Sequence, residues 1–126
     1  MCSIFQHPFY PYSGADKPAD NMCNVPLAAG SGGEEFRDAV SQVWLPRLRE
    51  FKPQMILISA GFDAHYEDDM GGLKLLEKDY FWCTEELRKF AAEHCNKRIV
   101  SMLEGGYVMT SLARSVGAHL RSLAEL

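Results

Sequence analysis

Short apolar runs alternate along the chain with longer stretches in which apolar residues recur every three or four positions. The short runs predict strands, and the longer amphipathic stretches predict helices. The predicted strands are residues 2–6, 55–58 and 98–103. The predicted helices are residues 31–51, 79–94 and 109–126. A strand followed by a helix, repeated three times, predicts an α/β fold with a mainly parallel sheet and flanking helices.

Prolines and glycines divide these elements. Residues 7–33 are rich in both and predict a long loop, in which residues 24–27 form a brief extended piece. Pro46 lies inside the first helical pattern and is expected to kink it. The uninterrupted apolar run Met-Ile-Leu-Ile at 55–58 is typical of a strand buried on both faces.

Size and charge limit the classes of function. With 126 residues and a hydrophobic content of 47%, the chain is expected to form one globular domain. The net charge of −4 gives no basic surface for nucleic acid and no polybasic membrane patch. No apolar run reaches the roughly 18 residues of a membrane span. The first residues lack the pattern of a signal peptide, so a cytoplasmic protein is expected.

The four cysteines, Cys2, Cys23, Cys83 and Cys95, show neither a Cys-x-x-Cys pair nor zinc-finger spacing. Reduced and mostly buried thiols are expected, with a disulfide as the less favoured alternative.

Two predicted strands run into glycine-containing turns that present a polar side chain, Asp63 and Tyr107. Ligand sites of α/β sheets lie at the carboxyl ends of the strands, so both side chains are expected in one crevice if the strands are parallel neighbours. Gly105 and Gly106 would let the backbone approach a ligand closely. The alternatives are a loop-capping aspartate and a packed loop tyrosine.

Neighbouring polar residues have simpler interpretations. His65 follows Asp63 by two positions, and both side-chain types bind zinc, but a loop residue behind the site is the preferred interpretation. The acidic residues at 67–69 are typical of a solvated loop. There is no Gly-x-Ser-x-Gly elbow of a serine hydrolase, and Gly-Ser-Gly-Gly at 30–33 lacks the ending of a phosphate loop.

Four ordered segments resemble the C-terminal region of the histone deacetylase superfamily, and most closely its branch of bacterial deacetylases and acetylpolyamine amidohydrolases. The segments are QHPFYPYSG, NVPLAAGSGGEEF, SAGFDAHYEDDMGGL and IVSMLEGGYVMTSLARSVGAHL. They extend over essentially the whole chain. The resemblance implies part of a three-layer arginase/deacetylase-like fold, with residues 1–126 as one partial domain.

The resemblance also implies roles for single residues. Asp63 corresponds to a zinc ligand, and Tyr107 to the catalytic tyrosine that donates a hydrogen bond to the substrate carbonyl. Tyr10, Met70, Gly105 and Gly106 correspond to walls of the tube that binds the substrate. The implied cofactor is zinc, and the implied substrates are acetylated lysines or acetylated polyamines.

The family's other zinc ligands, an Asp-x-His segment, and its paired histidines have no counterpart in the 126 residues. The chain is therefore expected to be incomplete as an enzyme, and Met1, which lies at the start of a predicted strand, supports a truncated domain. The alternative is an inactive remnant that binds a partner or itself. Exposed sheet and helix surfaces would then favour a homo-oligomer.

Overall fold

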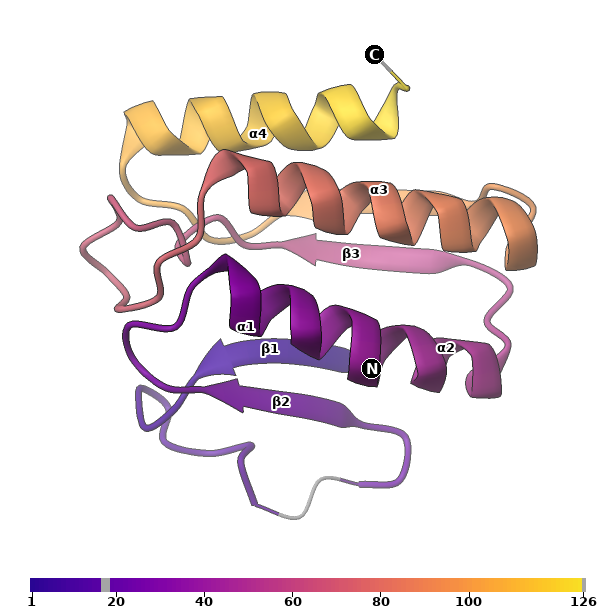
Figure 1. The fold of residues 1–126 in the computed structure, drawn as a ribbon, viewed down its shortest axis with the longest axis horizontal. Helices are drawn as coiled ribbons and strands as arrows, with labels where there is room; N and C mark the ends of the chain where they lie inside the picture. The colour runs from indigo at the N-terminus through magenta and orange to yellow at the C-terminus, as the bar shows by residue number, and fades with distance from the viewer. Residues whose placement is uncertain (17–18, 126) are drawn as a thin grey trace.

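The computed structural model describes residues 1–16 and 19–125, which form parallel strands covered by helices (Figure 1). The strands are β1 (Cys2–Gln6), β2 (Cys23–Leu27), β3 (Ile56–Ala60) and β4 (Ile99–Leu103). The helical segments are α1 (Gly33–Asp38), the π-helical η1 (Ala39–Trp44), α2 (Leu45–Phe51), α3 (Glu77–His94) and α4 (Met109–Leu123). The predicted α/β fold is confirmed, and the brief extended piece at 24–27 is part of β2.

The strands form two parallel pairs. β1 pairs with β2 from Cys2↔Cys23 to Gln6↔Leu27, and β3 pairs with β4 from Ile56↔Ile99 to Ala60↔Leu103. β1 and β3 run in the same direction in Figure 1. The loops that follow the strands therefore gather at one end of the molecule.

The helices pack on one face of the strands around a core that includes Val40, Ile56, Leu87 and Phe90. On β3, Ile56 and Ala60 are buried, whereas Leu57 between them is 66% exposed. The prediction that residues 55–58 are buried on both faces is therefore wrong: nothing in the described part of the chain covers the outer face of this strand.

A π-helical segment interrupts the predicted helix over residues 31–51. Pro46 lies in the first turn of α2, directly after η1, and the Leu45 amide donates to the Val40 carbonyl five residues earlier. A proline has no N–H and clashes with the carbonyl four residues before it. The wider π turn, which precedes the proline, is consistent with relief of that conflict.

A buried histidine connects α3, β4 and α4. His119 Nδ1 lies 2.7 Å from Thr84 Oγ1, and His119 Nε2 lies 2.8 Å from Ser101 Oγ. The ring also packs edge-on against Phe62, with 5.7 Å between centroids. This contact positions α4 over the segment that follows β3.

All four cysteines are free, but only Cys95 is fully buried; Cys2, Cys23 and Cys83 are half-buried. The expectation of mostly buried thiols is thus wrong, because Cys2 and Cys23 lie beside a groove. Within residues 1–16 and 19–125, no helix combines the length and apolar character needed to cross a membrane.

Candidate active site

Asp63 lies just after the carboxyl end of β3 and is held closely by glycine backbone. A Cβ atom added to Gly105 would lie 2.7 Å from Asp63 Cγ, and one added to Gly61 would lie 3.0 Å from Asp63 Oδ1. The Phe62 amide donates to the Gly105 carbonyl over 2.8 Å. Only glycine at position 105 leaves room for the carboxylate, so the two sequence motifs meet as predicted from parallel strands.

The electrostatic surroundings of Asp63 disfavour its charge. Partial burial raises the pKa of the Asp63 carboxyl, and the nearby negative charge of Asp68 raises it further. Among the described residues, no cation forms an ion pair with Asp63. A half-buried carboxylate without a counter-charge is a suitable position for a cation.

The turn after β4 carries Tyr107 to the same end of the molecule. Gly106 has φ +134, and a Cβ there would lie 2.7 Å from Leu112 Cδ1 and 3.2 Å from Phe62 Cβ. The backbone conformation at Gly106 therefore favours glycine, and a side chain there would also crowd Phe62. Tyr107 itself is 59% exposed, so its ring does not pack against the described core, and the alternative of a packed loop aromatic is wrong.

Asp68 connects this turn to the loop after β3 through hydrogen bonds. Its Oδ2 accepts a hydrogen bond from the Tyr107 amide over 2.8 Å, and its Oδ1 accepts one from the Met70 amide over 3.0 Å. Asp68 is only 4% exposed. The prediction of a solvated acidic loop is therefore wrong at this residue, because the carboxylate satisfies backbone amides of two segments.

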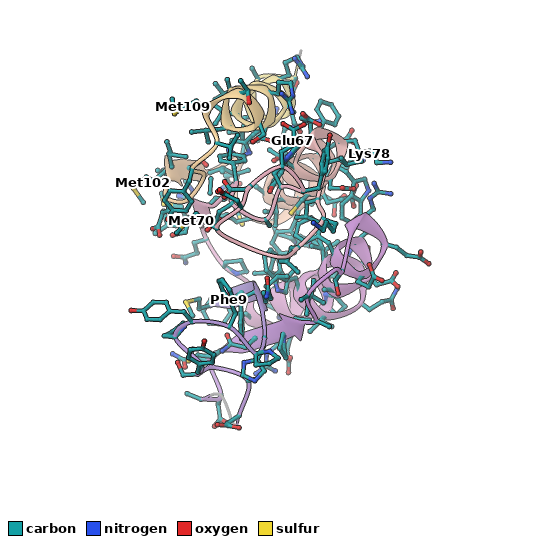
Figure 2. The ribbon with its side chains drawn as sticks, turned by 90° about the vertical axis from the view of Figure 1, so that its left-hand side faces the viewer. Phe9, Glu67, Met70, Lys78, Met102 and Met109 are labelled. Atoms are coloured by element: carbon teal, nitrogen blue, oxygen red, sulfur yellow. The ribbon has the colours of Figure 1, made fainter. Side chains whose placement is uncertain are left out.

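Met70, another predicted tube residue, lies at this end of the molecule, where the strands finish (Figure 2). Met70 is 58% exposed, and Tyr10, in the loop after β1, is 80% exposed. Neither side chain fills the core of the described structure. Asp68 joins Met70 to Tyr107, whereas no hydrogen bond within residues 1–16 and 19–125 joins Tyr10 to them.

His65 lies apart from the Asp63 carboxylate. It is fully buried; its Nδ1 accepts a hydrogen bond from the Glu67 amide over 3.2 Å, and its Nε2 lies 3.4 Å from Glu77 Oε1. Arg114 on α4 binds both glutamates. His65 therefore stabilises the loop after β3, in agreement with its preferred interpretation.

The residues present fit a metal only in part. Asp63 offers one carboxylate in a suitable setting, but no three His, Cys, Asp or Glu side chains of the described residues converge on one point. A catalytic zinc needs at least three protein ligands. The described part of the chain therefore provides no complete zinc site.

Comparison with known proteins agrees with this geometry. The model of the histone deacetylase domain matches residues 1–123. The chain belongs to the histone deacetylase family. The deacetylase-family chain also superposes on the crystal structure of the HDA15 HD domain with a TM-score of 0.88 and 30% identity, over 98% of this chain and 36% of that one.

Sequence relatives of this deacetylase-family chain come from both eukaryotes and bacteria. It is 40% identical to type-2 histone deacetylase 2 of Dictyostelium discoideum, over 93% of this chain and 8% of the relative. It is 33% identical to the histone deacetylase-like amidohydrolase of Pseudomonas aeruginosa, over 83% of this chain and 30% of the relative. The chain thus spans less than half of the length of each.

Proposed function

We propose that this chain supplies one side of a zinc-dependent deacetylase active site that hydrolyses N-acetyl amides. Asp63 would be one zinc ligand, and the Tyr107 hydroxyl would donate to the substrate carbonyl as negative charge develops on its oxygen. The remaining zinc ligands and the histidine that takes a proton from water would come from outside the described residues.

The observation that carries the proposal is the Asp63 carboxylate, half-buried against Gly105 and without a described counter-ion. Burial of an uncompensated charge is unfavourable unless a cation joins it. Tyr107 supports the proposal because its side chain is exposed while Asp68 fixes its backbone. A fixed backbone lets the hydroxyl be oriented before the reaction begins.

The proposed substrates are acetylated lysines or acetylated polyamines, and the proposed branch is that of bacterial deacetylases and acetylpolyamine amidohydrolases. The exposed side chains of Tyr10 and Met70 would form walls of the substrate tube, with Gly105 and Gly106 lining it through their backbone. Such a tube favours a slender, neutral acyl-amide chain. We propose no nucleic-acid or membrane partner.

The test is a chimera in which residues 1–126 replace the matching region of the Pseudomonas relative. We expect the chimera to release acetate from an acetylated lysine peptide or from an acetylpolyamine. Tyr107→Phe should lower kcat about 10²–10³-fold, because one donor to the developing oxyanion is lost. The matched control is Tyr66→Phe, also an exposed loop tyrosine, which should retain the rate. An active chimera whose rate is unaffected by Tyr107→Phe contradicts the role of Tyr107.

A second candidate function is a partner-binding or self-associating module without catalysis. The apolar side chains on the outer face of β3 and β4 favour it, since Leu57, Val100 and Met102 are all exposed there. An inactive chimera that is folded and binds no zinc would favour this candidate.

A further inference from the structure

Two cysteine side chains lie side by side at the start of the first strand pair. β1 and β2 are parallel, and Cys2 is the direct partner of Cys23 in their register. Side chains alternate between the two faces of a strand, so partners in register point to the same face of the sheet. Both thiols are free and half-buried. The fold thus brings together two sulfur ligands that are far apart in the sequence.

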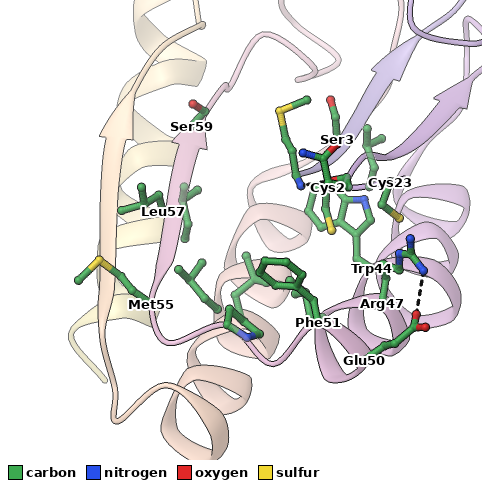
Figure 3. A pocket seen from close by; sticks show the side chains of 18 of the residues that line it. Cys2, Ser3, Cys23, Trp44, Arg47, Glu50, Phe51, Met55, Leu57 and Ser59 are labelled. Carbon is green, nitrogen blue, oxygen red and sulfur yellow. Dashed lines mark hydrogen bonds and ion pairs between the residues drawn. The ribbon is translucent and has the colours of Figure 1, made fainter. Parts of the chain in front are cut away.

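Both cysteines line a groove between the strand pairs β1–β2 and β3–β4 (Figure 3). The groove has a volume of about 820 Å³, and Trp44 and Arg47 line it from the helix layer. A small ion in solution can therefore reach the two sulfur atoms. Trp44 provides an optical reporter in the same groove.

The surroundings of the two thiols favour a shared cation. Burial, followed by the neighbouring Cys23, raises the pKa of the Cys2 thiol to about 11. Two adjacent thiolates repel each other, so Cys2 keeps its proton at neutral pH. A cation between the sulfurs replaces that proton and removes the repulsion.

Arg47 supplies a positive charge beside this pair. It favours the thiolate form of Cys2. Its guanidinium donates to Glu50 Oε2 over 2.8 Å and to the Asp20 carbonyl over 2.6 Å, which holds it in place. A monovalent cation bound by two thiolates leaves one negative charge, which Arg47 offsets in part.

The spacing of the strands distinguishes a bound ion from a disulfide. Adjacent strands lie about 4.8 Å apart, and two metal–sulfur bonds of about 2.3 Å in line span about 4.6 Å. An ion therefore fits between the sulfurs while the strands stay in place. A disulfide needs Cβ atoms about 3.8 Å apart, so the strands would have to approach by about 1 Å.

We propose that Cys2 and Cys23 form a two-thiolate site for one soft monovalent cation of the cuprous type. Thiolates are soft ligands and select soft ions such as Cu(I). Each thiol that binds the ion releases its proton to the solvent, and no electron is transferred. The proposal does not rest on the deacetylase function, because the pair lies at the start of β1 and β2 whereas Asp63 follows the end of β3.

Zinc is not expected at this pair. A structural zinc takes four ligands, and the described residues provide no group of three His, Cys, Asp or Glu side chains that could hold a metal. Two thiolates satisfy an ion that prefers two ligands in line but leave zinc half-coordinated. The site should therefore discriminate by coordination number.

The test is a titration of the 126-residue chain with Cu(I), under nitrogen with ascorbate and with bicinchoninate as the competing chelator. Trp82→Phe leaves Trp44 as the only tryptophan. We expect one Cu(I) per chain and quenching of Trp44 fluorescence that is complete at one equivalent. Ag(I), which has the same charge but does not oxidise thiols, should give the same stoichiometry. No binding of either ion against the chelator overturns the proposal.

Single variants locate the ligands. Cys2→Ser and Cys23→Ser should each lower the Cu(I) affinity more than about 100-fold, because loss of a direct ligand exceeds the 10–100-fold typical of an outer partner. Arg47→Gln should lower it about tenfold, within that range. The matched control is Cys83→Ser, which also removes a free, half-buried thiol and should retain the affinity. Wild-type affinity in either of the first two variants overturns the site.

A protection experiment on the wild-type chain does not depend on the folding of a variant. One equivalent of Ag(I) should protect Cys2 and Cys23 from alkylation by iodoacetamide, as mapped by mass spectrometry, and leave the reactivity of Cys83 unchanged. Protection of Cys83 in place of the pair overturns the proposal.

Oxidised glutathione and zinc provide the competing outcomes. Exchange with oxidised glutathione would join the two sulfurs and reduce glutathione to two thiols. A Cys2–Cys23 disulfide that forms readily in a chain that does not bind Cu(I) overturns the ion site in favour of a redox pair. Stoichiometric zinc at the pair overturns its selectivity. Asp63→Asn should leave Cu(I) binding unchanged, so failure of the proposed zinc function is distinguishable from failure of this site.

Discussion

At the scale of single residues, the carboxyl of Asp63 has its pKa raised above its ordinary value of 3.8, first by burial and then by Asp68. The folded chain therefore holds this proton more tightly than the unfolded chain does, and the free energy of unfolding falls as pH rises through the carboxyl range. We expect Asp63→Asn to be more stable than the wild type at pH 7, with the gain shrinking towards pH 3. Urea unfolding at both values measures this.

The matched variant for that experiment is Asp69→Asn, because Asp69 is exposed in the same loop. Its stability should follow the wild type at both pH values. A destabilised Asp63→Asn at pH 7 would show that the carboxylate has a favourable partner in the chain alone, contrary to the description above.

Asp68 holds the two loops that carry the candidate site. Asp68→Ala leaves the part-buried amides of Tyr107 and Met70 without their acceptor. Loss of the acceptor of a buried group typically costs about 1–3 kcal/mol of unfolding free energy. We expect a loss of about 2 kcal/mol or more in urea unfolding and faster hydrogen exchange at the Tyr107 amide. Asp69→Ala should change neither. Unchanged exchange at Tyr107 in Asp68→Ala would contradict the positioning role.

Sequence patterns predicted that the turns carrying Asp63 and Tyr107 would lie at one edge, because each turn follows a strand and parallel strands end on the same side. The contact of Gly105, in the second turn, with Asp63 agrees with that prediction.

Sequence patterns did not predict the role of Asp68. An aspartate among other acidic loop residues resembles a solvated one. Its amide partners Met70, Tyr107 and Val108 lie 2, 39 and 40 residues away. The local signal in the sequence was the pair of glycines, Gly71 and Gly72, three and four positions after Asp68. Adjacent glycines indicate a tightly folded loop.

At the scale of elements, the His119 contact among α3, β4 and α4 should make stability depend on pH. Burial lowers the pKa of His119 below its ordinary value of 6.5. The unfolded chain takes up this proton more readily, so the free energy of unfolding falls as pH drops below about 6.5. We expect a smaller loss between pH 7.5 and 5.5 in His119→Gln than in the wild type, measured by urea unfolding.

The control is His94→Gln, a partly exposed histidine on α3 that packs against Phe90. It should retain the pH dependence of the wild type. A wild-type pH dependence in His119→Gln would mean that another group titrates with folding.

The same elements show how far periodicity alone predicts a fold. The helices near residues 79–94 and 109–126 and the parallel order of β3 and β4 followed from apolar spacing and chain order. The exposure of Leu57 did not, since an all-apolar strand is buried on both faces only when two layers cover it. The π-helical turn before Pro46 was not predicted either, because the apolar spacing at 31–51 was compared with the α-helical period alone.

At the scale of the whole molecule, the chain combines the Asp63 end, which we propose as one side of a deacetylase site, with a groove between the strand pairs β1–β2 and β3–β4. The residues that would complete the proposed site come from outside the described part of the chain. Without a partner at these two features, the chain would keep an Asp63 carboxylate without a counter-charge and two open sheet edges. Open sheet edges are prone to association.

The most direct test is the zinc content per chain, measured by elemental analysis on the 126-residue protein alone and on the chimera with the Pseudomonas relative. The account predicts no stoichiometric zinc in the chain alone, even after dialysis against zinc, and one chelator-sensitive zinc in the chimera that Asp63→Asn removes. One tightly bound zinc per chain in the isolated protein, or a chimera that keeps its zinc without Asp63, would contradict it.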